Sequence, residues 1–271
     1  MQSLAYRFRL GRFEMTTLLA GTLTRPDPHG IFGVNATAED FGQVSRENFI
    51  PTDRTQFFYT PLLVNTGSER ILFDTGTDTD STAAAMAEAG YHPDQVDKIV
   101  LTHMHGDHVG GLIKNGAPGF SNATLLAGRI ENEYWTGTGA EAYDTRVAPL
   151  ADRMTLIEDG DQVAEGIHAL LAPGHTPGHM AFRFESDGAV LLHFADLANH
   201  YVWSLGRPDW QVRFDVDKVL ATQTRRKTLG MIADQRILAI GYHMPFPALG
   251  HVARDGDGFR WVPVSYQMML D

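Results

Sequence analysis

The sequence THMHGDHVGG occupies residues 102–111 and directly follows a short apolar segment. Within six of these residues lie four side chains that can bind metal ions: His103, His105, Asp107 and His108. In extended backbone His103 and His105 project to the same side, and a turn at Gly106 would bring the next two side chains back toward the same point. Zinc prefers imidazole and carboxylate ligands, and iron and manganese also accept them. We therefore predict a metal site here.

The composition limits the chemistry open to this chain. Its 271 residues include 12 histidines and no cysteine, which excludes disulfides, a cysteine nucleophile and thiolate metal sites. His and carboxylate must therefore supply any metal ligands. The net charge of −11 argues against a nucleic-acid partner, because binding to nucleic acid requires a basic patch or stripe.

The chain shows no pattern that would direct it to a membrane. Residues 1–24 never sustain the apolar core of about 7–15 residues that a signal peptide needs. No segment approaches the ~20 consecutive apolar residues of a membrane span. We therefore expect a cytoplasmic protein with no membrane partner.

Apolar periodicity predicts one mixed α/β (α+β) domain over residues 1–271, in which two sheets pack together and helices cover them. Strands are predicted at 57–64, 70–73, 97–101, 122–127, 154–158, 163–171, 179–184, 189–195, 236–240 and 259–266. Helices are predicted at 81–89 and 215–234, with Asp215 as the N-cap of the second. Residues 25–56 are rich in turn-forming residues and are expected to form a long ordered excursion, either a lid or a dimerisation contact.

Four further blocks accompany the metal motif. They are Asp74-Thr75-Gly76 after a strand, the PGHTPGH segment at 173–179, Phe194-Ala195-Asp196 at a strand end, and Tyr242-His243-Met244-Pro245. Together with the His-x-His-x-Asp-His pattern, these blocks resemble, in order, the metallo-β-lactamase superfamily. The resemblance spans roughly residues 57–250, which is nearly the whole chain.

This resemblance implies a four-layer αββα sandwich with two divalent metal ions at the edge of the sheets. One ion would take His103, His105 and His175, and the other Asp107, His108 and His243, with Asp196 and a hydroxide bridging them. Zinc is the first expectation, and manganese, iron or cobalt are alternatives. Asp107 and Asp196 would be the catalytic residues that hold the hydroxide, whose pKa a two-metal site brings toward neutrality. Asp74 would orient a metal-bound histidine without binding the metal itself.

Several other histidine and aromatic residues have a structural or a functional interpretation. His179 shares a block with His175, and since one ligand is needed there we interpret it as structural; His193 is interpreted as a core histidine. His200 lies four residues after Asp196 and is a candidate to face the substrate or to protonate the leaving group. Three aromatic residues are candidates to line an apolar pocket, although large aromatics are more often core: Trp135, Trp203 and Phe246.

The block HMPFPALGHV at residues 243–252 is similar to the superfamily branch of methyl-parathion hydrolases and quorum-quenching lactonases. That similarity implies that the bridging hydroxide cleaves a small-molecule lactone, such as an N-acyl homoserine lactone, or an organophosphate ester. Asn199 stands where one lactonase subgroup has tyrosine, so the assistance that this tyrosine gives the leaving group does not carry over. True β-lactamase activity is disfavoured, because that branch lacks the bridging aspartate.

Two alternatives stay open. A glyoxalase-II-like thioesterase shares all the metal ligands, but its basic, helical C-terminal extension is replaced here by a strand-like segment at 259–266. A non-catalytic metal-binding protein on the same fold is the alternative of another class. A homodimer is compatible with the excursion at 25–56 but is not required by it.

Overall fold

The computed structural model describes residues 3–268 and contains two seven-stranded sheets. The first sheet has the order β1-β2-β5-β6-β7-β10-β11. Its strands are β1 (Ala5–Leu10), β2 (Phe13–Leu18), β5 (Leu62–Asn65), β6 (Arg70–Phe73), β7 (Lys98–Val100), β10 (Thr124–Gly128) and β11 (Met154–Ile157). Pairing is antiparallel from β1 to β6 and parallel from β6 to β11.

The second sheet has the order β12-β13-β14-β15-β16-β17-β18. Its strands are β12 (Gln162–Ala164), β13 (Ile167–Leu171), β14 (Met180–Ser186), β15 (Ala189–His193), β16 (Leu238–Ile240), β17 (Leu249–Asp255) and β18 (Gly258–Pro263). Only the β15–β16 pair is parallel in this sheet.

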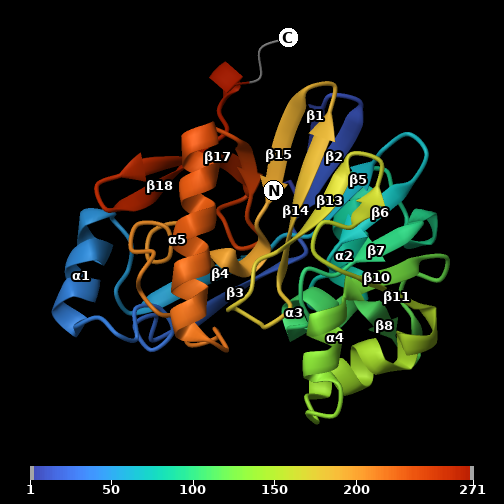
Figure 1. Cartoon of the computed structure of the whole chain (residues 1–271), viewed down its shortest axis with the longest axis horizontal. Coiled ribbons are helices and arrows are strands. Elements are labelled where there is room, and N and C mark those ends of the chain that lie inside the picture. Colours follow the sequence, from blue (N-terminus) through green and yellow to red (C-terminus); the bar gives the residue numbers. More distant parts are fainter. Residues whose placement is uncertain (1–2, 269–271) are drawn as a thin grey trace.

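Side chains point alternately to the two faces of each sheet, so the strands pack against the other sheet on one face and against helices on the other, which gives four layers. Ile71 and Phe73 of β6 point into the core between the sheets, whereas Leu72 points outward to α2 (Thr79–Glu88). On β15, Leu191 faces the inner core and Leu192 faces α5 (Lys218–Gln235). Figure 1 shows α5 on one outer side and α2 with α4 (Arg129–Trp135) on the other. The predicted αββα sandwich is confirmed.

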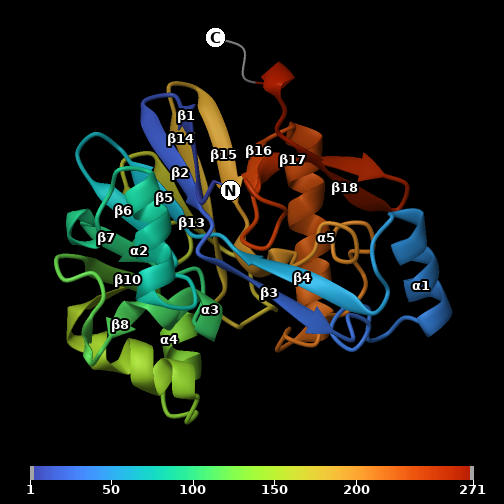
Figure 2. The ribbon, with the colours of Figure 1, turned by 180° about the vertical axis from the view of Figure 1, so that it is seen from behind.

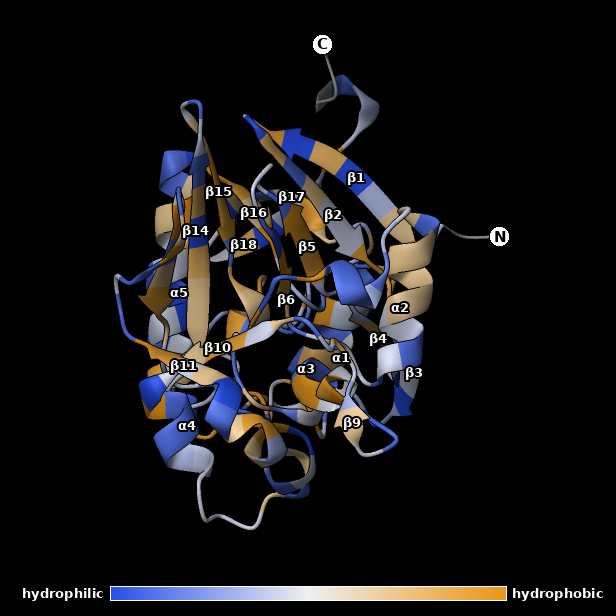
Figure 3. Ribbon diagram, turned by 90° about the vertical axis from the view of Figure 1, so that its right-hand side faces the viewer, coloured by the Kyte–Doolittle hydropathy of each residue, from blue (hydrophilic) through white to orange (hydrophobic). Residues whose placement is uncertain are grey.

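Figure 3 shows the same pattern in the hydropathy colours, with apolar residues on the interior strand β5 and alternating bands along the edge strand β1. The described residues form two further α-helices, α1 (Ala38–Glu47) and α3 (Gly106–Val109). Among residues 3–268, no helix combines the length and the apolar character that a membrane span requires.

Some predicted elements differ from the structure. The strand predicted at 57–64 is two strands, because Pro61 interrupts it and offers no N–H to a ladder. Its first part, β4 (Arg54–Tyr59), pairs instead with β3 (Gly21–Pro26) in a separate ribbon. Figure 2 shows this ribbon running toward α1. The strand predicted at 163–171 is the hairpin β12–β13, which turns at Gly166 with φ 74°.

The excursion at 25–56 contains the helix α1, which the sequence did not predict. Thr37 caps this helix by accepting a hydrogen bond from the Asp40 N–H at 3.1 Å. Its buried side chains Phe41 and Val44 pack with Trp203 and Tyr242 in a cluster of their own. The excursion therefore lies against the segment that precedes α5.

Candidate metal centre

The metal motif occupies the loop after β7 and the single turn α3. His103 and His105 do face the same point, with His103 Nε2 3.1 Å from His105 Nδ1. The turn that begins at Gly106 brings back His108, whose ring lies 3.9 Å from that of His103 between centroids. The local geometry expected from the spacing is therefore present.

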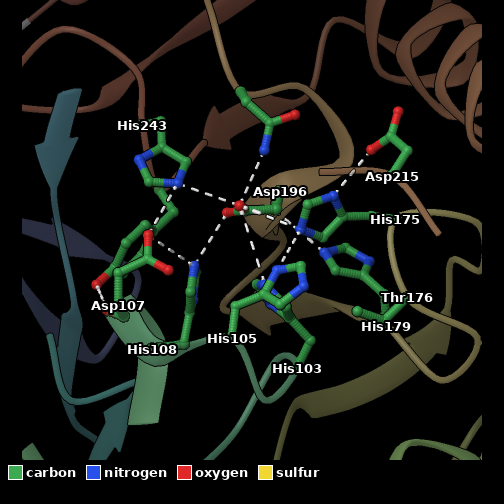
Figure 4. Close-up of polar contacts among 12 residues, drawn as sticks. His103, His105, Asp107, His108, His175, Thr176, His179, Asp196, Asp215 and His243 are labelled. Atoms are coloured by element: carbon green, nitrogen blue, oxygen red, sulfur yellow. Dashed lines mark hydrogen bonds and ion pairs between the residues drawn. The ribbon is translucent and has the colours of Figure 1, made fainter. Parts of the chain in front are cut away.

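Distant segments complete three groups of potential ligands, drawn in Figure 4. In each group the ligand atoms lie within 4.8 Å of one another: His103, His105 and His175; His103, His108 and Asp196; and Asp107, His108 and His243. In the first group His105 Nδ1 is 3.0 Å from His175 Nε2. In the third, Asp107 Oδ2 is 3.4 Å from His243 Nε2. All seven predicted ligands are thus brought together.

Asp196 lies between the two outer groups, in the loop that follows β15. Its Oδ1 is 3.3 Å from His108 Nε2, and its Oδ2 is 3.1 Å from His243 Nε2. The same Oδ2 is 3.4 Å from His175 Nε2. Asn199 also donates to this oxygen at 2.9 Å. One buried carboxylate therefore contacts candidate ligands from both sides of the cluster.

The donor set fits a cation. His108 Nε2 and Asp196 Oδ1 are buried and, apart from their 3.3 Å contact with each other, have no hydrogen-bond partner among the described residues, although burying a polar atom without a hydrogen bond costs about 1–3 kcal/mol. Burial lowers the pKa of His103 well below its usual range and that of His105 to about 3. Both imidazoles are then neutral, which is the form that binds metals.

Oxygen atoms contact the Nδ1 atoms of two candidate ligands, His108 and His243. Asp74 Oδ2 lies 2.8 Å from His108 Nδ1, and the same carboxylate accepts hydrogen bonds from the N–H and hydroxyl of Thr102. The carbonyl of Phe58 lies 2.8 Å from His243 Nδ1. Asp74 can therefore orient His108, which is the role proposed for it from the sequence.

Asp215 has a different place from the one predicted. The helix α5 begins at Lys218, and its N-cap is Asp217, which accepts from the Leu220 N–H at 2.9 Å. The predicted N-cap, Asp215, is buried and its Oδ1 lies 2.9 Å from His175 Nδ1. The N-cap assignment was wrong because a tertiary contact, invisible in the local sequence, engages this carboxylate.

Glu131 on α4 is a second buried carboxylate that the sequence pattern missed. It accepts from the Met104 N–H at 3.0 Å and from the Gly178 N–H at 3.0 Å. It also accepts from Thr176 Oγ1 and from the Trp135 indole. Glu131 therefore connects the loop of the metal motif to the loop that carries His175. No local motif marks it, because its main partners lie 27 and 47 residues away.

Two further histidines, His179 and His193, lie near the seven candidate ligands, which together are called the cluster below. His179 Nε2 accepts from the backbone N–H of Asp196 at 3.1 Å, and its Nδ1 lies 3.1 Å from the Ala172 carbonyl. His179 therefore helps to hold the loop of Asp196, in keeping with a structural interpretation. His193 is fully buried, and neither of its ring nitrogens has a hydrogen-bond partner among the described residues.

The four candidate pocket residues have different surroundings. His200 and Trp203 line a cavity of about 460 Å³ that also reaches His243. The ring of Trp135 lies 5.6 Å from that of His105, and its indole donates to Glu131. Phe246 is half-buried and lines neither cavity beside the cluster. A second cavity of about 460 Å³ is lined by Asp107, Asp196 and His243 among others.

Comparisons with known proteins agree with this picture. The family model of the metallo-beta-lactamase superfamily matches residues 54–234. An N-acyl homoserine lactonase of Bacillus thuringiensis is 33% identical over 118 residues, which is 43% of this chain and 44% of that protein. The lactamase-like protein aptB of Emericella nidulans is 31% identical over 131 residues, which is 47% of this chain and 37% of that protein. These matches therefore span less than half of either relative.

Likeness to solved structures covers nearly the whole chain. AidC, a dizinc quorum-quenching lactonase solved with a product, superimposes with a TM-score of 0.90 at 25% identity, over 98% of this chain and 99% of that one. The hydrolase AbOPH of the beta lactamase superfamily gives the same values.

Proposed function

Because this chain belongs to the metallo-beta-lactamase superfamily, we propose that it is a metal-dependent hydrolase that opens a lactone ring, with an N-acyl homoserine lactone as the representative substrate. The observation that carries this proposal is the position of Asp196, which lies between two groups of candidate ligands and lines the cavity that Asp107 and His243 also line. The likeness to a dizinc lactonase supports the use of divalent metal and the choice of a lactone.

The side chains are arranged for hydrolysis at a binuclear site. Two divalent ions, with zinc as first candidate, would lower the pKa of a shared water and polarise the ester carbonyl. The three-histidine group and the group of Asp107, His108 and His243 would hold one ion each, with Asp196 between them. The Asp107 side chain is 28% exposed and lines the cavity, so this carboxylate can take a proton from the attacking water and give it to the leaving alkoxide oxygen, which becomes the product hydroxyl.

The other cavity offers a place for the acyl part of the substrate. Its lining includes Ile50, Phe58 and Trp203, and it shares His243 with the cavity that Asp107 and Asp196 line. Apolar walls of this kind would remove an acyl chain from water. Asn199 already donates to Asp196, so we assign it to holding that carboxylate rather than to the leaving group.

Residues 25–56 supply part of this lining through Ile50, Pro51, Arg54, Thr55 and Gln56. This supports a role of the excursion as a wall or lid over the substrate within one domain of residues 1–271. A dimerisation role stays a prediction, and light scattering coupled to size-exclusion chromatography measures it directly.

The test is acid release by pH-stat with metal-loaded protein and an N-acyl homoserine lactone. We expect turnover that chelation abolishes and that zinc or cobalt restores, and none with the Asp196→Asn variant. Absence of turnover by protein that binds its metals would contradict the lactonase proposal and favour a phosphotriester or a thioester.

A further inference from the structure

A buried ion pair behind the cluster connects His175 to the segment that walls both cavities. We propose that Asp215 and Arg225 are positioning residues, which hold His175 in its ligand orientation and couple it to residues 197–215. The inference rests on the proposed metal site but not on the identity of the substrate. No side chain of this pair is among the seven candidate ligands.

The first step is the contact between Asp215 and His175. Because Asp215 Oδ1 lies 2.9 Å from His175 Nδ1, the imidazole can donate its single proton to this carboxylate. Its Nε2 lone pair then points into the cluster, where it lies 3.4 Å from Asp196 Oδ2. The backbone reinforces the contact, since the Val216 N–H donates to the His175 carbonyl at 2.9 Å.

The second step is the arginine. The side chains of Arg225 and Asp215 have no exposed area, and Arg225 Nη2 donates to Asp215 Oδ2 at 2.9 Å. The remaining guanidinium donors reach three backbone carbonyls, those of Leu197 at 2.7 Å, Pro208 at 3.2 Å and Trp210 at 3.0 Å. Arg225 therefore joins α5 to both ends of the segment 197–215.

That segment carries the walls of the proposed substrate site. It begins beside Asp196, contributes His200, Tyr201 and Trp203 to one cavity, and contributes Phe214 to the other. The Arg225 guanidinium thus holds the segment 197–215 in place. Through Asp215 it also positions His175, a candidate metal ligand. Coupling between two sites is reciprocal, so metal at His175 should also order the segment.

The planar fork of arginine is required for this arrangement. A lysine keeps the charge but presents its donors from one nitrogen, and cannot reach four acceptors spread around a guanidinium. An asparagine at 215 keeps the shape of the acid but removes the charge that pairs with Arg225. Asp215→Asn therefore disturbs the contacts with both His175 and Arg225, whereas Arg225→Lys leaves the side chains of Asp215 and His175 unchanged and tests the arginine contacts alone.

The chain offers a matched control in the next residue of α5. Arg226 forms a bidentate pair with Asp209 of the same segment, but both side chains are solvent-exposed. Arg226→Lys therefore repeats the chemical change of Arg225→Lys without touching Asp215. Retention of fold in each variant is checked by circular dichroism.

The experiment titrates zinc-loaded protein with a chelator and measures lactone kinetics on the same samples. We expect Asp215→Asn to hold the His175-bound zinc about 10–100-fold more weakly, as is typical when the partner of a metal-bound histidine is lost. Arg225→Lys should raise KM more than it lowers kcat, and Arg226→Lys should match the unaltered protein. A folded Asp215→Asn variant that retains zinc as tightly as the unaltered protein would overturn the proposal.

A second measurement uses only the unaltered protein, so it tests the proposal even if the Asp215 and Arg225 variants fail to fold. Hydrogen exchange of the unaltered protein is compared with and without zinc. We expect zinc to protect amides at 197–217 while leaving the edge strand β1, which pairs only with β2 among the described strands, unchanged. Equal exchange at 197–217 would overturn the coupling. Zinc-dependent protection without lactone turnover would count against the proposed substrate and leave this inference standing.

Discussion

Asp196 illustrates how much of the chemistry depends on single side chains. Its two oxygens lie within 3.4 Å of nitrogens on His108, His175 and His243. Burial alone would raise its pKa, but the histidines hold the pKa of this carboxyl well below its usual range. It is therefore available as an anion at every pH near neutrality.

Asp196→Ala should lose much of one metal ion and reduce kcat by about 1000-fold or more, since metal clamping of the transition state contributes several kcal/mol. Metal stoichiometry by plasma emission and lactone kinetics measure both effects. Asn199→Ala is the control, because it removes only one hydrogen bond to the same carboxylate. Full activity with two metals in Asp196→Ala would contradict the bridging assignment.

His193 should contribute a pH dependence to stability. Burial lowers its pKa to about 4, so protonation favours the unfolded chain, in which the pKa is about 6.5. The contribution is fully present above about pH 6.5 and is lost as the pH falls toward 4. Between pH 7.5 and 5 this amounts to about 2 kcal/mol.

The measurement is urea unfolding in the presence of a chelator, so that metal release does not contribute. His193→Leu should lose about 2 kcal/mol less than the unaltered protein over that range. Equal pH dependence of the two proteins would show that His193 is not buried as a neutral group.

At the scale of elements, the position of the His175 loop depends on its close approach to α5. A Cβ built on Gly174, where φ is 128°, would lie 2.3 Å from the Ala221 backbone nitrogen. Any side chain there must push α5 away from the loop. Since Asp217 N donates to the Gly174 carbonyl at 3.0 Å, the helix start and the loop move together.

Gly174→Ala should therefore destabilise the fold by about 1–3 kcal/mol through overpacking and weaken metal retention as well. Thermal unfolding and metal content measure the two effects. Gly160→Ala is the control, since Gly160 has a positive φ of 86° but nothing within 4 Å of the added carbon. If both variants lost equal stability, backbone strain rather than close approach would explain Gly174.

At the scale of the whole molecule, the cluster joins the two sheets. His103 to His108 follow β7 of the first sheet, whereas His175, Asp196 and His243 come from loops after β13, β15 and β16 of the second. A metal ion bound by ligands from both would stabilise the sandwich against separation of its halves.

Removal of metal should lower Tm by about 5–10 °C, because a ligand at 100 to 1000 times its Kd contributes about 3–4 kcal/mol. Scanning calorimetry before chelation, after it and after return of zinc measures the shift. An unchanged Tm in protein verified to be metal-free would contradict a structural role of the ions.

Local spacing was sufficient for much of the fold and the site. Residues 70–73 alternate between two apolar faces, and the 102–111 segment holds four candidate ligands, so neither requires knowledge of distant contacts. The sequence did not predict the pairing of β1 and β2 or the amphipathic helix α1. These elements are stabilised by the sheet and the apolar cluster against which they pack, and those contacts come from distant parts of the chain.

The amino-acid sequence by itself indicated the candidate ligands within residues 103–108 and the apolar alternation of the strands, because ligand spacing and strand periodicity are properties of neighbouring residues. The further candidates His175, Asp196 and His243 were inferred from the family resemblance of their sequence blocks. Only the tertiary structure decided how Asp215, Arg225 and Glu131 act. Each was an ordinary polar residue in its local context, and each is buried with partners from other segments. Folding converts such residues into supports of the site because a buried charge must find its hydrogen bonds wherever the chain brings them.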